Sequence, residues 1–220
     1  MVLRWIGRTL IAVGTLILLF LAYQLFGTNF VTSRSQAQLR AHFFTGAKTP
    51  IPNRTATLFT GGPGVSPTAT PPAEAPRVKP DLGTGVALIE IPKIDLSAIV
   101  VEGVDVPDLK KGPGHYPGTP LPGNSGNVVI SGHRTTYGHP FYNLNELSAG
   151  DPIYLTDPDG EKFTYVVDHN DIVAPTAVQV VSNTKDDRLT LTTCNPRFSA
   201  AQRLIVVAKL QGPTPAQPIS

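Results

Sequence analysis

Apolar residues along the chain form two kinds of run. Near the start, residues 10–26 make one long apolar stretch without a charged side chain. Between residues 86 and 210 the apolar runs are short, rich in Val, Ile, Thr and Tyr, and bounded by turn residues, which is typical of β-strands. These runs cover 87–94, 97–104, 126–133, 151–157, 161–175, 187–194 and 203–210. Seven or eight strands, about ten residues apart, predict an all-β fold that is either a closed barrel or a sandwich.

The segments between these runs predict turns and short helices. Residues 157–160, with the sequence DPDG, have the composition of a hairpin turn. Residues 141–151 are the best candidate for a short helical turn in the β-rich region. Residues 33–44, which precede that region, are compatible with a short helix.

The long apolar stretch predicts a membrane anchor. As a helix, residues 10–26 would be about 25 Å long, close to the thickness of a bilayer core. A cleaved signal peptide has a similar pattern, but residues 23–26 are bulky and provide no small-residue cleavage site. Because Arg4 and Arg8 precede the stretch, we expect a single-pass protein of the cell membrane with a cytoplasmic N-terminus and an extracellular β-rich domain.

Composition divides the rest of the chain. Residues 48–83 are rich in Pro, Thr, Gly and Ala without apolar periodicity, which predicts a disordered or polyproline-type spacer. The expected parts are a cytoplasmic N-terminus with the anchor, a juxtamembrane segment with the spacer, a catalytic domain, and a disordered Pro-rich tail. These parts cover residues 1–34, 35–84, 85–211 and 212–220, in that order.

Charge and cysteine content exclude several classes of function. The formal net charge of the 220-residue chain is only +2, and no run of Lys or Arg forms a patch, so nucleic acid is not an expected partner. The single cysteine, Cys194, excludes an internal disulfide and a site built from several thiolates. The sequence gives no reason to expect a metal or another cofactor.

Three side chains have the chemistry of an acyl-transfer site. Cys194 ends one predicted strand and Arg203 begins the next, so two antiparallel neighbours would share one rim. His133 follows the strand run at 126–131, and a parallel pairing with the Cys194 strand would bring it to the same rim. A thiol is a nucleophile, an imidazole an acid or base, and a guanidinium a partner for an oxyanion. Taken singly, each residue also has an ordinary structural explanation.

The sequence contexts of these residues identify a resemblance. The segment TLTTCNP, with an Arg nine residues after the Cys, resembles the active-site signature of sortases, the cysteine transpeptidases of Gram-positive surfaces. The segment GNVVISGHRTTYGHPF resembles their histidine segment, and HYPGTPLPGNSGNVVISGHR is most similar to class E, the housekeeping type of high-GC actinobacteria. The resemblance covers about residues 87–210.

The resemblance implies a fold and a set of roles. The implied fold is an eight-stranded β-barrel with one or two short helical turns. Cys194 would be the nucleophile, His133 the general acid and base, and Arg203 the group that stabilises the oxyanion and positions the substrate. The implied sorting signal is Leu-Ala-x-Thr-Gly, with Tyr116 helping to read its second position. Thr193 would place a hydroxyl beside the nucleophile.

Alternatives remain for several of these residues. Tyr116 is also compatible with a packed loop, and Thr193 with a strand that simply continues. His115, His139 and His169 do not match the family pattern, so we interpret them as non-catalytic. Some sortases use calcium, but no acidic cluster in this sequence argues for it.

The implied partners are secreted surface proteins with a C-terminal sorting signal and an amine of a lipid-linked cell-wall precursor at the membrane. A pilus-polymerising sortase is the nearest alternative, but such enzymes typically carry a C-terminal membrane span and this tail is polar. An L,D-transpeptidase would carry Ser-His-Gly before its cysteine, whereas Cys194 follows Leu-Thr-Thr. A non-enzymatic, membrane-tethered binding domain would keep Cys194 only as a packed residue.

Overall fold

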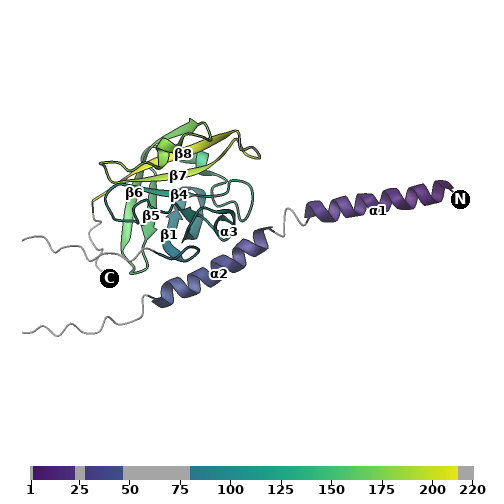
Figure 1. Cartoon of the computed structure of the whole chain (residues 1–220), viewed down its shortest axis with the longest axis horizontal. Coiled ribbons are helices and arrows are strands. Elements are labelled where there is room, and N and C mark those ends of the chain that lie inside the picture. The colour runs from purple at the N-terminus through teal and green to yellow at the C-terminus, as the bar shows by residue number, and fades with distance from the viewer. Residues whose placement is uncertain (1, 23–27, 47–79, 213–220) are drawn as a thin grey trace, which may run out of the picture.

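A computed structural model describes residues 2–22, 28–46 and 80–212, and Figure 1 shows their arrangement. The eight strands are β1 (Gly85–Ile91), β2 (Leu96–Glu102), β3 (Gly114–His115), β4 (Asn127–Ser131), β5 (Pro152–Thr156), β6 (Lys162–Val173), β7 (Arg188–Asn195) and β8 (Gln202–Leu210). The helices are α1 (Val2–Ala22), α2 (Thr28–Gly46) and the short α3 (Val106–Leu109), and the 3-10 turns are η2 (Pro92–Ile94), η3 (Leu144–Glu146) and η4 (Val178–Val181).

The strands close into a barrel in the order β1-β2-β3-β4-β7-β8-β6-β5. The pairs β2–β3 and β4–β7 are parallel, and the remaining neighbours are antiparallel. The predicted eight-stranded β-barrel is therefore confirmed. Its shortest strand, β3, has two residues and left no pattern in the sequence. The hairpin turn at 157–160 and the helical turn within 141–151, which is η3, are also where the sequence predicted them.

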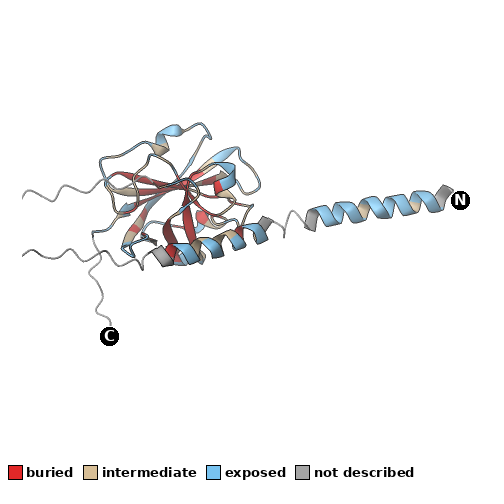
Figure 2. Cartoon of the chain, turned by 60° about the horizontal axis from the view of Figure 1, so that its bottom comes forward, coloured by how far each residue is buried: buried red, intermediate tan, exposed pale blue. Residues whose placement is uncertain are grey.

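The core of the barrel follows from the two-residue period of its strands. Leu189 and Leu191 of β7 point inward, and so do Val128 and Ile130 of β4. Buried strand residues fill the barrel between exposed loops (Figure 2). Each fully buried aliphatic side chain contributes roughly 1.5–3 kcal/mol relative to an exposed one. Because alternate residues face outward, every strand also presents side chains on the outer surface of the barrel.

Helix α2 packs against the outside of the barrel, along β1 and β2 (Figure 1). Phe43 is 7% exposed and forms a small apolar cluster with Leu88 and Ile99. The helix is longer than the 33–44 segment that the sequence suggested. It lies in a part of the chain that we expected to connect an anchor to a spacer, and it instead contacts the folded domain.

The expected membrane anchor coincides in part with α1. Its predicted span, 10–26, extends into residues 23–27, which lie outside the described residues, as do most of the spacer and residues 213–220 of the tail. Among the residues that the structure describes, no helix is sufficiently long and apolar to cross a membrane.

A buried pair joins β2 to β3. The Nδ1 atom of His115 lies 2.6 Å from Oε2 of Glu102, and both side chains are 2% exposed. The other ring nitrogen of His115 lies 3.0 Å from the carbonyl oxygen of Pro120 and 3.0 Å from the hydroxyl of Thr119. These contacts give His115 a structural role, because they fix the turn that follows β3.

We predict that Glu102→Ala lowers the free energy of unfolding by about 3 kcal/mol or more, since it leaves a buried polar partner without its counterpart. The matched control is Glu90→Ala, which removes a carboxylate whose partner, Lys162, lies at the surface. That change should cost at most about 1 kcal/mol. Urea unfolding of both variants measures the difference, and equal small losses would contradict a stabilising role for the buried pair.

Candidate active site

The strand register brings Cys194, Arg203 and His133 to one end of three adjacent strands. Cys194 of β7 lies directly opposite Arg203 of β8. On the other side of β7, Thr192 pairs in parallel with Ser131 of β4. His133 is two residues beyond Ser131, just as Cys194 is two residues beyond Thr192. The C-terminal ends of β4 and β7 and the start of β8 therefore meet at this rim.

These side chains belong to the outer face of the barrel wall. Leu191 of β7 and Leu204 of β8 face the core, so the alternation of strand residues places Cys194 and Arg203 on the opposite face. Directly opposite residues of antiparallel strands have Cβ atoms about 4.5–5.5 Å apart. The thiol and the guanidinium therefore start from adjacent points on one surface, and Cys194 is partly exposed there.

Thr193 joins the cysteine strand to the histidine segment. Its hydroxyl donates a hydrogen bond of 2.7 Å to the carbonyl oxygen of Gly132, and the side chain is 3% exposed. The amide of Gly132 in turn donates to the carbonyl oxygen of Thr192. The buried Thr193 hydroxyl is therefore bound to the chain, and it links the residue before Cys194 to the residue before His133.

The environment of His133 favours the neutral imidazole. Its ring is partly buried and packs against the Tyr137 ring, with the two centroids 5.1 Å apart. The buried Nε2 atom has no hydrogen-bond partner among the described residues. Burial is the larger cause that lowers the pKa of His133, and the positive charge of Lys110 lowers it further. Because an imidazole ordinarily has a pKa near 6.5, His133 is neutral at pH 7 and can accept a proton.

Arg134 is a site residue that the sequence analysis missed. It is 5% exposed, and its Nη1 atom donates to the carbonyl oxygen of Cys194 at 3.1 Å and to Oδ1 of Asn195 at 2.6 Å. Its Nη2 atom donates to Oδ1 of Asn145 at 2.9 Å. Burial, and then the charge of Arg197, lower the pKa of Arg134, but a guanidinium stays protonated in proteins. This buried cation connects the histidine segment, the end of β7 and η3.

A second arginine holds the β7–β8 loop. The guanidinium of Arg197 stacks 4.1 Å from the Tyr142 ring and donates from Nε to the Tyr142 carbonyl oxygen. Its Nη2 atom donates to the side chains of Asn143 and Asn145. The loop that separates Cys194 from Arg203 is thereby fastened to the segment around η3.

Arg203 lies at the surface with part of its hydrogen-bonding capacity in use. Its Nη1 atom donates to the carbonyl oxygens of Ala200 and Gln202, each at 3.0 Å. A guanidinium has five N–H donors in a planar fork, so these two bonds leave donors for a ligand. The loop therefore orients Arg203 and leaves its other N–H donors available to a ligand.

Tyr116 lies farther along the same wall. It is 37% exposed, and its amide donates to the carbonyl oxygen of Val129. Val129 precedes His133 by four residues, which corresponds to about 13 Å along a strand. The Tyr116 backbone therefore lies beside β4, at the residue four positions before His133.

The remaining histidines lie away from this rim or at its edge. His169 is exposed on β6 between Asp168 and Asp171, and His139 packs edge-on against Tyr142. Within residues 2–22, 28–46 and 80–212, no group of three or more His, Cys, Asp or Glu side chains is arranged to hold a metal ion.

A thiol, a neutral imidazole and a surface guanidinium at the rim of a closed β-barrel are the groups that a cysteine-dependent acyl transfer requires. Residues 89–211 match the family model of the Sortase domain, which is more than half of the chain. The chain belongs to the sortase family, whose members are cysteine transpeptidases. The resemblance seen in the sequence is confirmed, and the family match sets aside an L,D-transpeptidase.

Named sortases are similar to the chain. Sortase D of Bacillus subtilis is 38% identical over 136 residues, which are 60% of this chain and 66% of that protein. Sortase SrtE1 of Streptomyces coelicolor is 32% identical over 228 residues, 94% of this chain and 56% of that protein. The chain thus spans between about half and two thirds of the length of these relatives.

Solved structures show the same barrel. Sortase E from Streptomyces avermitilis has a TM-score of 0.55 and 38% identity, and covers 60% of this chain and 91% of its own. Sortase C from Clostridium perfringens, solved with the C-terminal cell wall sorting motif, has a TM-score of 0.56 and 30% identity, and covers 60% of this chain and 72% of its own.

We predict that Lys110→Met raises the pKa of His133 toward its ordinary value without reaching it, since burial is the larger cause of the lowered pKa. NMR titration of the His133 ring measures this shift. The control is Lys111→Met, because Lys111 pairs with Asp108. An unchanged His133 pKa in the Lys110 variant would contradict the electrostatic contribution of Lys110.

The same pKa has a consequence for stability. Because the pKa of His133 is lower in the folded chain, the unfolded chain takes up a proton first as the pH falls below about 6.5. The contribution of His133 to stability is therefore fully present above that pH and is lost as the pH falls toward the lower pKa.

We predict that Arg134→Met destabilises the fold by about 2–3 kcal/mol, because hydrogen bonds to a charged group are lost and buried acceptors are left unpaired. Arg134→Lys should recover only part of this loss, since an ammonium lacks the planar fork. Urea unfolding compares both with Arg188→Met, whose partner Asp186 is at the surface. Equal stability of the Arg134 and Arg188 variants would refute the role assigned to Arg134.

Proposed function

We propose that this chain is a membrane-attached transpeptidase that cuts a C-terminal sorting signal and transfers the acyl part to an amine through a thioester on Cys194. The observation that carries the proposal is the register of three strands. Cys194 and Arg203 are cross-strand partners, and His133 extends from the strand on the other side of Cys194. Membership of the sortase family supports the same reaction.

The first half of the reaction uses the neutral His133. As the Cys194 sulfur attacks the carbonyl carbon of the Thr residue in the signal, His133 accepts the thiol proton. The carbonyl oxygen becomes an oxyanion, which the free donors of Arg203 stabilise. His133 then gives the proton to the leaving amine of the following Gly, the peptide bond breaks, and a thioester remains.

The second half reverses the proton transfers. An incoming amine attacks the thioester carbonyl while His133 removes a proton from it. The second oxyanion collapses, the bond from carbon to sulfur breaks, and the thiolate takes back the proton from His133. One amide bond is broken and another is formed, so the reaction requires no oxidant, reductant or cofactor.

The proposed signal is of the Leu-Ala-x-Thr-Gly type. An extended peptide advances about 3.3 Å per residue, so a chain of about four residues would reach from Cys194 along the wall toward Tyr116. The exposed ring of Tyr116 is suited to contact a small side chain near the start of such a signal. The Clostridium perfringens sortase C that was solved with the C-terminal cell wall sorting motif supports this class of substrate.

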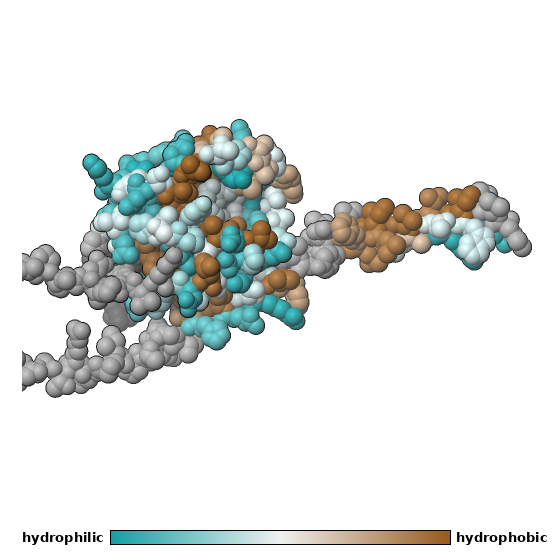
Figure 3. Space-filling view, viewed as in Figure 1, coloured by the Kyte–Doolittle hydropathy of each residue, from teal (hydrophilic) through white to brown (hydrophobic). Residues whose placement is uncertain are grey.

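The proposed partners are secreted surface proteins that carry the signal and an amine of a lipid-linked cell-wall precursor. We place the chain at the cell membrane as a single-pass protein, with its N-terminus in the cytoplasm and the barrel outside. The support is the apolar surface of α1 (Figure 3), where Trp5 is 70%, Leu10 68% and Ile11 71% exposed. The similarity to SrtE1 and to sortase E supports a class E assignment.

We predict that Cys194→Ala and His133→Ala abolish transfer, and that Arg203→Ala lowers its rate about 10²- to 10³-fold, as loss of an oxyanion donor commonly does. Mass spectrometry of the chain mixed with a Leu-Ala-x-Thr-Gly peptide and a small amine measures both the product and the thioester adduct. His169→Ala is the matched control, because its ring lies on β6 outside the site, and it should keep full activity.

Two results would oppose the proposal. Full transfer by folded Cys194→Ala or His133→Ala would refute the assigned roles. Absence of both adduct and product from the unaltered, folded chain, across a panel of sorting-type peptides and amines, would point to a binding module with a silent cysteine.

A further inference from the structure

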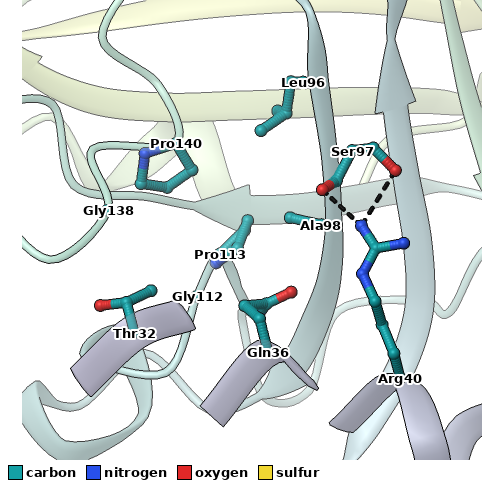
Figure 4. A pocket seen from close by; sticks show the side chains of 10 residues that line it. All are labelled: Thr32, Gln36, Arg40, Leu96, Ser97, Ala98, Gly112, Pro113, Gly138 and Pro140. Atoms are coloured by element: carbon teal, nitrogen blue, oxygen red, sulfur yellow. Dashed lines mark hydrogen bonds between the residues drawn. The ribbon is translucent and has the colours of Figure 1, made fainter. Parts of the chain in front are cut away.

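We propose that α2 is part of the catalytic unit, and that Asn29 and Thr32 are positioning residues that support the turn at residues 137–139, which packs against His133. The proposal rests on the proposed function insofar as His133 is the acid and base of transfer. In sequence, more than thirty residues separate α2 from β1. The first turns of α2 nevertheless contact the turn at residues 137–139, which is called the histidine turn below. Figures 1 and 4 show the helix beside the barrel and the turn.

The middle of α2 is fixed to the edge of β2. The Gln36 side chain accepts from the Ile99 amide at 2.7 Å and donates to the Ile99 carbonyl oxygen at 2.9 Å. These two bonds reproduce what a neighbouring strand would offer to this residue. Nε2 of Gln36 also donates to the Lys111 carbonyl oxygen. A Cβ at Gly112 would collide with the Gln36 amide, so glycine at this position permits the close approach.

The first turns of α2 contact the histidine turn directly. Oδ1 of Asn29 accepts a hydrogen bond of 3.1 Å from the Gly138 amide. A Cβ on Gly138 would lie 2.9 Å from Cγ2 of Thr32, so the helix and the turn touch there. The Thr32 hydroxyl donates to the carbonyl oxygen of Lys110 at 2.8 Å, and Thr32 is 6% exposed. Residues on one helix thus hold both the turn and the segment beside it.

The turn is one that requires external support. Tyr137, Gly138 and His139 have φ values of 50°, 74° and 38°, so three successive residues adopt the left-handed region. Glycine tolerates this conformation, but for the other two residues it costs free energy. Such backbone persists only where its surroundings determine it. The bond from Gly138 to Asn29 is made at the middle residue of the three.

Two contacts join the turn to His133, one from a residue of the turn and one from a residue that follows it. The Tyr137 ring packs on the His133 ring. After the turn, the Phe141 amide donates to the His133 carbonyl oxygen at 3.2 Å. If α2 moves away, the left-handed turn loses its support and the ring that packs against the imidazole moves with it.

Between Asn29 and Arg40, the contact of α2 with the barrel is mostly polar and incompletely filled. A cavity of about 170 Å³ remains between them, and Figure 4 shows Thr32, Gln36 and Arg40 on one side and Ser97 and Pro140 among the residues on the other. Arg40 donates to the backbone and the hydroxyl of Ser97. Because a few hydrogen bonds hold the first half of α2, loss of two of them should loosen the turn while the Phe43 cluster still retains the helix.

The test uses the full chain with both bonds removed, Asn29→Ala together with Thr32→Val. The first readout is hydrogen exchange of residues 132–142 by mass spectrometry, which does not depend on any reaction. We expect exchange in this segment to accelerate about tenfold while β7 and β8 stay protected. The second readout is peptide transfer, where we expect kcat to fall roughly 10- to 100-fold with little change in KM, because a displaced imidazole misaligns the proton transfer.

Two control variants sharpen the result. Ser33→Ala alters an exposed neighbour on α2 and should change neither readout. Asn29→Asp retains an acceptor oxygen for the Gly138 amide. This single variant should therefore keep slow hydrogen exchange of residues 132–142 and most of the transfer rate. Unchanged exchange of 132–142 in the double variant would overturn the proposal. If the unaltered chain lacked transfer activity, the exchange data would still decide whether α2 supports the turn, so the two proposals fail separately.

Discussion

The parallel pairing of β4 with β7 is the contact on which the rest of the site depends. Parallel strands end on the same side, so this pairing alone brings a residue that follows β4 next to the last residues of β7. The bond from the buried Thr193 hydroxyl to Gly132 extends the pairing beyond the ladder. Arg134 then fastens the same segment to the carbonyl of Cys194. The backbone pairing of β4 with β7 thus places Cys194 and His133 at one rim, and the side chains of Thr193 and Arg134 stabilise that arrangement.

The charges around the site act in different ways because they differ in burial. Arg134 is buried and donates from Nη1 and Nη2 to the chain, so it has a structural role, whereas Arg203 is at the surface with donors left for a ligand. Lys110 keeps a positive charge near His133, which favours the neutral imidazole. A site with cations on several sides suits a reaction whose intermediate is an oxyanion.

Helix α2 belongs to the same packed unit as the barrel, although it lies far from β1 in the sequence. The small cluster around Phe43 and the amide of Gln36 attach it to β1 and β2, and its first turns reach Gly138. A helix that adjoins the proposed anchor thereby contacts the turn that shapes the histidine. The barrel and α2 therefore meet at the turn that packs against His133.

The sequence by itself determined the longer strands and the family, because alternating apolar residues, turn residues and the contexts of His133 and Cys194 are local patterns. The strand pattern alone fitted a barrel and a sandwich equally well. It could not determine that Thr193 turns its hydroxyl to Gly132, that Arg134 is buried, or that α2 docks on the barrel. Two-residue β3 was also invisible to any pattern. Those features depend on contacts between segments far apart in the chain, and only the closed barrel decides which polar groups find partners there.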